Sequence, residues 1–172
     1  MNKDQLVAQL ESGIEDRVAD LAERLTSAGL WFACAESCTG GLLSKFCTDR
    51  AGSSGWFERA FITYSNAAKQ QMLGVDPLII QNNGAVSEQV ARAMVVGVME
   101  NAPVQVAASV TGIAGPGGGS EEKPVGTVCF GFYTLSYGFQ VETRCFAGDR
   151  EMVRLQSVEH VFSVLLQQLK PN

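Results

Sequence analysis

Residues 104–110 read Val-Gln-Val-Ala-Ala-Ser-Val, a nearly continuous apolar run. Strands with apolar residues on both sides belong to sheets that are covered on both faces, so this segment predicts a central strand. Four other segments have strand character: residues 30–35, 60–64, 125–133 and 139–146. The last two of these predict an antiparallel hairpin with a turn at 136–138.

Helical patterns alternate with these strands. They cover about residues 40–47, 65–73 and 87–101, and a last helix follows Asp149. At the N-terminus, apolar residues spaced by three or four from Leu6 to Leu25 predict an amphipathic helix, with a break near Ser12-Gly13. We therefore expect an α/β fold, a three-layer α/β/α sandwich with a mixed, mostly parallel sheet. Residues 1–172 fit a single domain.

Charge and composition exclude several classes of function. The formal net charge is −5, which argues against nucleic-acid binding but not against a small phosphate ligand. The charged N-terminal residues do not form a signal peptide, and no apolar run approaches a membrane span. The five cysteines include no CxxC pair and predict reduced thiols. We expect a cytoplasmic protein with no membrane partner.

The first candidate site lies at residues 35–41, which read AESCTGG. This segment falls between a predicted buried strand and a helix, at the sheet edge where open α/β sheets bind ligands. Helix N–H groups there suit an anion or oxyanion. Ser37, Cys38 and Thr39 are candidate nucleophiles, and Glu36 is the neighbouring carboxylate. The alternative is a helix N-cap by Ser37 or Thr39 followed by glycines that allow tight packing.

The second candidate site is YSNAAK at residues 64–69. Tyr64 ends a predicted strand and Lys69 lies in the first turns of the next helix, so both can project toward one sheet edge. A lysine partly removed from water has a lowered pKa and can act as a general base toward a hydroxyl. Alternatively, Lys69 is a solvated helix charge and Tyr64 a half-buried strand aromatic.

The third candidate site is the glycine-rich segment that follows the central strand, TGIAGPGGGS at residues 111–120. Its glycines allow the backbone to approach a ligand and to form an anion-binding nest, although it could also be a flexible loop. It lacks the spacing of a P-loop or a dinucleotide fingerprint. Arg150 and Arg154 could each bring positive charge to a phosphate.

His160 is the only histidine, and it falls inside the last predicted helix, away from these segments. This position argues strongly against a Ser–His–Asp hydrolase and against a multi-histidine metal centre. We expect activity without a metal and without a cofactor.

Four segments in order closely resemble the CinA C-terminal domain family over most of the chain: residues 35–41, 64–69, 84–94 and 111–128. Stand-alone members of that family are nicotinamide mononucleotide deamidases. The resemblance implies hydrolysis of the nucleotide's carboxamide to nicotinate mononucleotide and ammonia, in pyridine nucleotide salvage. It also implies that Ser37 is the nucleophile, that Lys69 and Tyr64 assist proton transfer, and that Thr111 contributes to the site.

The remaining expectations concern substrate contacts and assembly. We predict oxyanion donors at the Gly40-Gly41 turn, and substrate contacts from these residues: Glu36, Thr39, Gly40, Gly41, Gly112, Gly117, Gly118 and Arg150. Cys38 is the rival nucleophile. Another amide or nucleotide substrate, or a non-catalytic nucleotide-binding or competence-related regulatory module, is the alternative function. A homo-oligomer, specifically a dimer, is expected, with Trp56 and Phe57 either at its interface or in the core.

Overall fold

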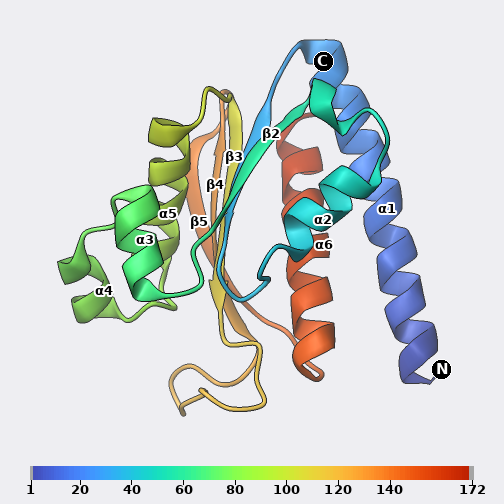
Figure 1. Cartoon of the computed structure of the whole chain (residues 1–172). Helices are drawn as coiled ribbons and strands as arrows, with labels where there is room; N and C mark the ends of the chain where they lie inside the picture. Colours follow the sequence, from blue (N-terminus) through green and yellow to red (C-terminus); the bar gives the residue numbers. More distant parts are fainter. Residues whose placement is uncertain (1, 171–172) are drawn as a thin grey trace.

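The computed structural model describes residues 2–170, which form a five-stranded sheet between two layers of helices (Figure 1). The strand order is β2-β1-β3-β4-β5. Strand β1 (Phe32–Glu36) pairs in parallel with β2 (Phe57–Ile62) and with β3 (Val106–Gly112). Strand β4 (Thr127–Thr134) is antiparallel to β3 and to β5 (Gly138–Cys145). The predicted mixed sheet and terminal hairpin are confirmed.

The helices divide between the two faces of the sheet (Figure 1). One layer contains α1 (Lys3–Ala28), α2 (Leu42–Asp49) and α6 (Arg150–Gln168). The other layer contains α3 (Asn66–Leu73), α4 (Pro77–Asn83) and α5 (Glu88–Asn101), and a short 3₁₀ turn, η1 (Ser53–Gly55), precedes β2. The three-layer α/β/α sandwich is therefore confirmed.

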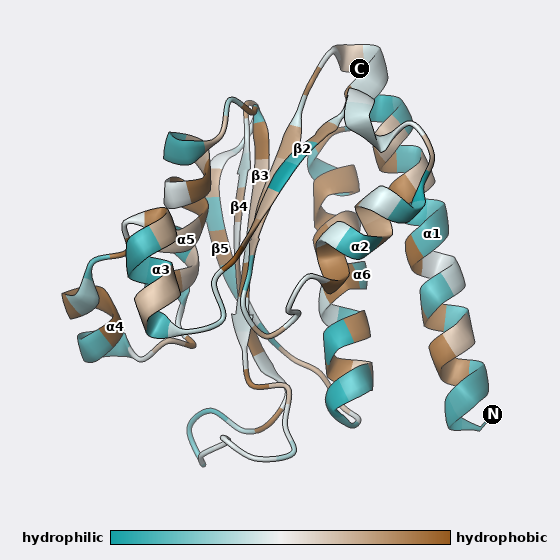
Figure 2. Cartoon of the chain, in the orientation of Figure 1, coloured by the Kyte–Doolittle hydropathy of each residue, from teal (hydrophilic) through white to brown (hydrophobic). Residues whose placement is uncertain are grey.

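Strand β1 shows why both faces of the sheet need cover. All five of its residues are buried, and their side chains alternate between two separate cores. Phe32 and Cys34 belong to the core with α1, α2 and α6, whereas Ala33 and Ala35 belong to the core with α3 and α5. The apolar faces of the helices turn toward the sheet (Figure 2). A strand that is buried on both sides cannot show polar–apolar alternation.

Local capping signals begin the helices where the sequence predicts them. The Ser87 side chain accepts a hydrogen bond from the Val90 N–H at the start of α5, and Asp149 does the same for Met152 at the start of α6. Ser65 caps α3, which ends at Gly74 in the left-handed conformation with φ 66°.

One prediction about the helices was wrong, and one helix was missed. Helix α1 is continuous through Gly13, whose carbonyl accepts a hydrogen bond from the Arg17 side chain, and α1 packs along α6. This tertiary support outweighs the cost of about 1 kcal/mol for a glycine inside a helix. Helix α4 was missed, although Asp76-Pro77 supplies an N-cap and a proline at the first helical position.

Of the two places considered for Trp56, a dimer interface or the core, the structure shows the core, because Trp56 is 2% exposed.

The topology brings three chain segments to one edge of the sheet. Strands β1, β2 and β3 are mutually parallel, so their carboxyl ends lie at the same edge. Residues 37–41, 63–65 and 113–126 follow these ends. They include most of the three segments that the sequence singles out for chemistry.

Candidate active site

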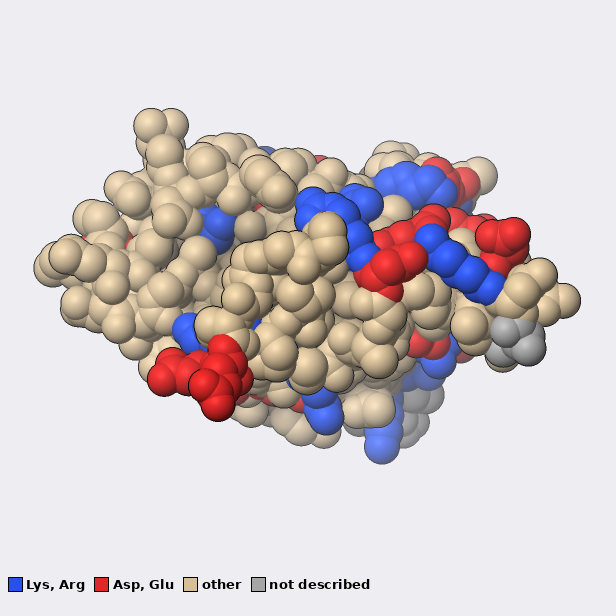
Figure 3. Space-filling model, turned by 90° about the horizontal axis from the view of Figure 1, so that it is seen from below, with Lys and Arg blue, Asp and Glu red and all other residues tan. Residues whose placement is uncertain are grey.

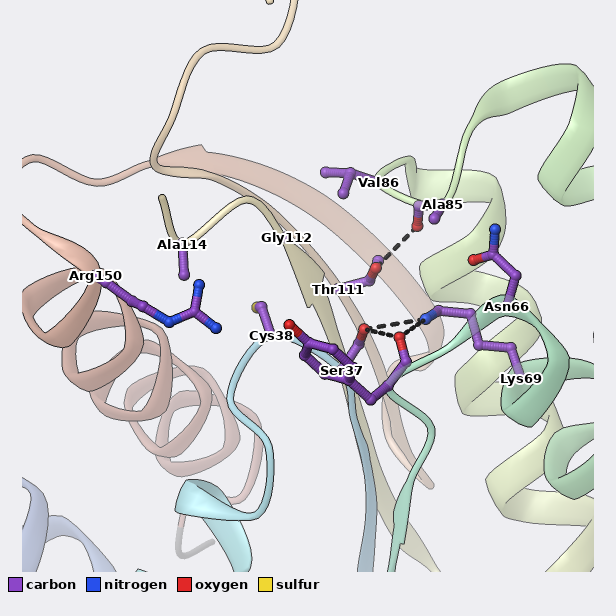
Figure 4. A pocket seen from close by; sticks show the side chains of 11 residues that line it. Ser37, Cys38, Asn66, Lys69, Ala85, Val86, Thr111, Gly112, Ala114 and Arg150 are labelled. Carbon is purple, nitrogen blue, oxygen red and sulfur yellow. Dashed lines mark hydrogen bonds between the residues drawn. The ribbon is translucent and has the colours of Figure 1, made fainter. Parts of the chain in front are cut away.

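Ser37 and Lys69 form a hydrogen-bonded pair at this edge. Ser37 directly follows β1, and Lys69 lies in the first turns of α3, which begins shortly after β2. Lys69 Nζ lies 3.0 Å from Ser37 Oγ (Figure 4). The sequence placed both segments at this sheet edge, the family resemblance implied that the two residues act together, and the structure brings their side chains into contact.

The other contacts of the Lys69 amine define what it can do for Ser37. Nζ donates hydrogen bonds to the carbonyl oxygens of Thr63, at 2.9 Å, and Tyr64, at 3.4 Å. Carbonyl oxygens only accept, so they occupy two N–H groups. In the neutral amine, the remaining position toward Ser37 Oγ is a lone pair, which can accept the serine proton. The arrangement is therefore that of a nucleophile beside a general base.

Burial favours that neutral form. Lys69 is 1% exposed, and removal of its charged form from water lowers its pKa below the ordinary value. The Cys38 thiol acts in the opposite direction, more weakly. The interpretation of Lys69 as a solvated helix charge is therefore wrong.

A pocket of about 270 Å³ opens beside the pair (Figure 4). Its lining comes from five chain segments: Ser37 and Cys38; Tyr64, Asn66 and Lys69; Ala85 and Val86; Thr111, Gly112 and Ala114; and Arg150. Charged side chains of both signs are interspersed at this end of the molecule and form no continuous basic surface (Figure 3). The pocket is of a size for a small ligand rather than a polymer.

Arg150, and not Arg154, contributes to this pocket. The Arg150 guanidinium lies across the pocket from Asn66 (Figure 4), and its Nη1 donates to the Gly115 carbonyl at 2.8 Å. Arg154 Nη2 instead donates to the Thr39 carbonyl at 2.7 Å, outside the lining. Because α6 starts at Arg150, this residue alone of the two reaches the site.

Glu36 supports the nucleophile loop and does not line the pocket. Its carboxylate is fully buried and accepts hydrogen bonds from the N–H groups of Gly41, Leu43 and Ser44, at 2.8–3.0 Å. These donors are the otherwise unpaired N–H groups at the start of α2. Glu36 is thus a residue at the end of β1 whose carboxylate is hydrogen-bonded to backbone.

The predicted oxyanion donors at the Gly40-Gly41 turn are already occupied. Gly41 N–H donates to Glu36, and Gly40 N–H donates to the Ser37 carbonyl at 3.1 Å. That prediction was wrong because the turn satisfies its own backbone. By contrast, no oxygen within residues 2–170 accepts a hydrogen bond from the N–H groups of Cys38 and Thr39.

Five further predictions of substrate contact concern residues that lie outside the lining. Besides Glu36, the residues that do not line the pocket are Thr39, Gly40, Gly41, Gly117 and Gly118, whereas Gly112 does line it. Thr39 is fully buried. Gly112 is required by packing, because a Cβ there would lie 2.8 Å from Val128 Cγ2 and 3.1 Å from Cys38 Sγ.

Tyr64 and Thr111 reach the site in ways that the sequence did not indicate. The Tyr64 carbonyl accepts from Lys69, but the residue is 65% exposed and its phenol makes no hydrogen bond within the described chain. The Thr111 hydroxyl donates to the Ala85 carbonyl at 2.8 Å. Ala85 and Val86 themselves were missed, although they lie in the third segment of the family resemblance.

Cys38 does not have the properties of a nucleophilic thiolate. Its side chain is buried, and burial raises the pKa of the thiol to about 12. The nearby Arg154 and Lys69 lower this pKa, and their effect is smaller than that of burial. A thiol that stays protonated is a poor nucleophile. The geometry therefore favours Ser37 over Cys38.

His160 lies outside the pocket and pairs with Glu142, with 2.5 Å between Nε2 and the carboxylate oxygen. Among residues 2–170, no three His, Cys, Asp or Glu side chains gather in a way that could hold a metal ion. No helix of the same residues is both long and apolar enough to cross a membrane.

The sequence and the fold have counterparts among known proteins. The model of the family described as the CinA C-terminal domain matches residues 14–169. A protein of Enterobacter agglomerans named nicotinamide-nucleotide amidohydrolase PncC is 51% identical over 154 residues, covering 90% of this chain and 93% of the relative. The protein of that name from Escherichia coli K12 is 48% identical, covering 88% and 92%.

Solved structures agree with this similarity. The competence/damage inducible protein CihA from Agrobacterium tumefaciens superimposes with a TM-score of 0.88 at 38% identity, covering 92% of this chain and 96% of that one. A CinA superfamily protein from Escherichia coli has a TM-score of 0.86 at 34% identity, covering 90% of each chain.

Proposed function

The chain belongs to the CinA C-terminal domain family, and from this premise we propose that it is an amidohydrolase that converts nicotinamide mononucleotide to nicotinate mononucleotide and ammonia. The observation that carries the proposal is the 3.0 Å contact between Ser37 Oγ and the buried Lys69 amine. The names of the two relatives at about half identity support the substrate. The reaction would belong to pyridine nucleotide salvage.

Acylation begins with Ser37. Its Oγ attacks the carboxamide carbon while its proton passes to the Lys69 lone pair, which gives a tetrahedral intermediate and a lysine ammonium. The carbon–nitrogen bond then breaks, and Lys69 returns the proton to the departing nitrogen, which leaves as ammonia. The product is an ester of Ser37 with the nicotinate ring.

Deacylation uses the same base. Lys69, neutral again, accepts a proton from a water molecule that attacks the ester carbon. Collapse of the second tetrahedral intermediate breaks the bond to Ser37 Oγ, which regains its proton from Lys69. The carboxylate product then leaves, and the pair is ready for another cycle.

The tetrahedral oxygen needs a hydrogen-bond donor, and we assign the N–H group of Cys38, a residue that lines the pocket, to this role. Cys38 follows the nucleophile directly, and no oxygen within residues 2–170 accepts a hydrogen bond from its N–H group. Glu36 supports this N–H group indirectly, because it holds later N–H groups of the same loop. The loss of one oxyanion donor typically costs about 10²–10³-fold in kcat.

We assign binding of the substrate's phosphate to the guanidinium group of Arg150. It is the one guanidinium in the lining, and it lies on the side of the pocket opposite Asn66 and α3 (Figure 4). With the carboxamide at Ser37, the ribose phosphate would extend toward Arg150 and the glycine-rich loop. Guanidinium groups pair well with phosphate oxygens. Tyr64 borders the pocket, and its assistance in proton transfer stays a proposal that Tyr64→Phe tests.

Assembly and location complete the proposal. We propose that the chain works as a homodimer in the cytoplasm, with the nucleotide as its only partner. All five cysteines are free, which supports a reducing compartment. Sedimentation analysis tests the dimer, and a single species of monomer mass at micromolar concentration would contradict it.

The deciding experiment is ammonia release by the purified protein from nicotinamide mononucleotide, with Ser37→Ala measured alongside. We expect turnover by the wild type and loss of turnover in the variant. If the folded wild type binds the nucleotide but releases no ammonia, the non-catalytic binding module replaces this proposal. If the protein deamidates another amide instead, Ser37 remains the proposed nucleophile and the proposed substrate is wrong.

A further inference from the structure

One wall of the pocket is a stretch of irregular backbone with unusually complete hydrogen bonding. Residues 83–86 run from the last residue of α4 into the connection to α5, and they include Ala85 and Val86 of the lining. Each of their four consecutive carbonyl oxygens accepts a hydrogen bond from a side chain: Asn83 from Lys123 at 2.9 Å, Gly84 from Ser87 at 2.9 Å, Ala85 from Thr111 at 2.8 Å, and Val86 from Lys123 at 2.7 Å.

Lys123 supplies two of these four hydrogen bonds from a distant part of the chain. It lies in the glycine-rich loop 113–126, about 40 residues further along. The loop is itself closed at this point, because Ser120 N–H donates to the Lys123 carbonyl and Lys123 N–H donates to the Ser120 hydroxyl, at 2.9 and 3.0 Å. The half-buried ammonium thus connects a closed turn to the wall.

We propose that Lys123 is a positioning residue that holds the Ala85–Val86 wall against the substrate and thereby sets the affinity of the site. The inference rests on the proposed function and deepens it. Ala85 and Val86 lie on the side of the pocket away from Arg150, and Ser37 and Lys69 lie below them in the view of Figure 4. The apolar side chains of Ala85 and Val86 match the flat ring that carries the carboxamide, whereas Arg150 faces the phosphate.

The lysine is suited to this task because one ammonium reaches two carbonyl groups at once. Asn83 is the last residue of α4, so its carbonyl carries part of the negative end of the helix dipole, which favours a cation. If the ammonium is removed, both carbonyl groups lose their donor and the glycine-rich loop loses its attachment to the wall. Ser37 and Lys69 keep all of their contacts, because none of them involves Lys123.

Because Lys123 contacts the wall and not the Ser37–Lys69 pair, its loss should raise KM and leave kcat nearly unchanged. Lys123→Met keeps the length of the side chain and removes its donors, so we expect KM for nicotinamide mononucleotide to rise about 10-fold or more, with kcat within about threefold of wild type. Lys123→Arg retains a cation with several donors and should recover most of the affinity. Lys45→Met is the control, since Lys45 is exposed and its ammonium contacts Asp49 and the Phe46 ring, both outside the pocket lining.

Two further readouts separate positioning from a general loss of structure. Inactivation by phenylmethylsulfonyl fluoride, a small reagent for activated serines, should proceed at the wild-type rate in Lys123→Met, because Ser37 and Lys69 are intact. Hydrogen–deuterium exchange should accelerate in peptides that cover residues 80–90 and 113–126, and not in α1 or α6.

The outcomes distinguish this inference from the proposed function. Unchanged exchange and unchanged KM in Lys123→Met would overturn the positioning role, as would a fall in kcat together with slower inactivation by the sulfonyl fluoride. If the wild type releases no ammonia from the nucleotide, the proposed function fails. In that case, faster hydrogen–deuterium exchange in Lys123→Met, together with a normal rate of serine labelling, still supports the positioning role of Lys123. Unchanged exchange overturns that role.

Discussion

Lys69 Nζ and Ser37 Oγ lie 3.0 Å apart although their residues are 32 positions apart in the chain. The contact depends on the parallel pairing of β1 with β2, which carries the Thr63 carbonyl next to Ser37 and holds the amine between them. A serine and a buried amine in this geometry need no histidine. The predictions that follow test what each part of this arrangement contributes.

Replacement of either member of the pair should abolish turnover. In Ser37→Ala and Lys69→Met, kcat for ammonia release should fall by at least about 10³-fold, because removal of either nucleophile or base disables the same unit. The double variant should be no slower than the slower single one. Circular dichroism checks folding, and a folded Lys69→Met with near wild-type kcat would disprove the general-base role.

Activity should depend on the protonation of Lys69. At low pH the amine is an ammonium and cannot accept the serine proton, so kcat/KM should rise with pH and level off above the pKa of Lys69. Burial lowers that pKa, so the midpoint should fall below the value of about 10.4 for a free lysine. A pH–rate profile measures the midpoint, and one at or above that value would contradict the role of burial.

The same shift should make stability depend on pH. The unfolded chain binds the Lys69 proton more tightly than the folded chain, so the free energy of unfolding should rise with pH between the folded and unfolded pKa values. Urea unfolding at several pH values measures the slope, and Lys69→Met should reduce it.

Glu36→Gln should destabilise the protein and slow the reaction. The amide presents an N–H₂ group to backbone donors that now meet a carboxylate oxygen, and an unsatisfied buried donor costs about 1–3 kcal/mol. Urea unfolding measures the loss of stability. Glu23→Gln, on the exposed face of α1, is the control and should stay within about 0.5 kcal/mol of wild type.

Cys38→Ala should retain most of the activity. Burial keeps the pKa of the thiol at about 12, so it is neither the nucleophile nor readily alkylated at neutral pH. Iodoacetamide should modify the exposed Cys145 first, with no loss of turnover. Rapid inactivation that tracks alkylation of Cys38 would restore the rival mechanism.

Arg150→Met should weaken recognition of the phosphate. KM for nicotinamide mononucleotide should rise about 10–100-fold, because a charge-assisted hydrogen bond contributes more than a neutral one. Hydrolysis of nicotinamide riboside, which lacks the phosphate, should be nearly unchanged. An equal effect on both substrates would assign Arg150 to the glycine-rich loop, whose Gly115 carbonyl it already contacts.

The sequence alone determined the layers of the fold and the segments that meet at the site. Burial on both faces of β3, the periodicity of α5 and α6, and the N-caps Ser87 and Asp149 are local properties of the chain, so they can be read without coordinates. The meeting of Ser37 with Lys69 followed because parallel strands end at one edge of a sheet.

Only the tertiary structure decided which polar group bonds to which. Glu36 and the Gly40-Gly41 turn were predicted to face the substrate, but the start of α2 needed the carboxylate for its own N–H groups. Lys123 reached the wall across 40 residues, and packing against α6 kept α1 unbroken. Hydrogen-bond partners far apart in sequence leave no local pattern, because each choice depends on which other groups the fold has already satisfied.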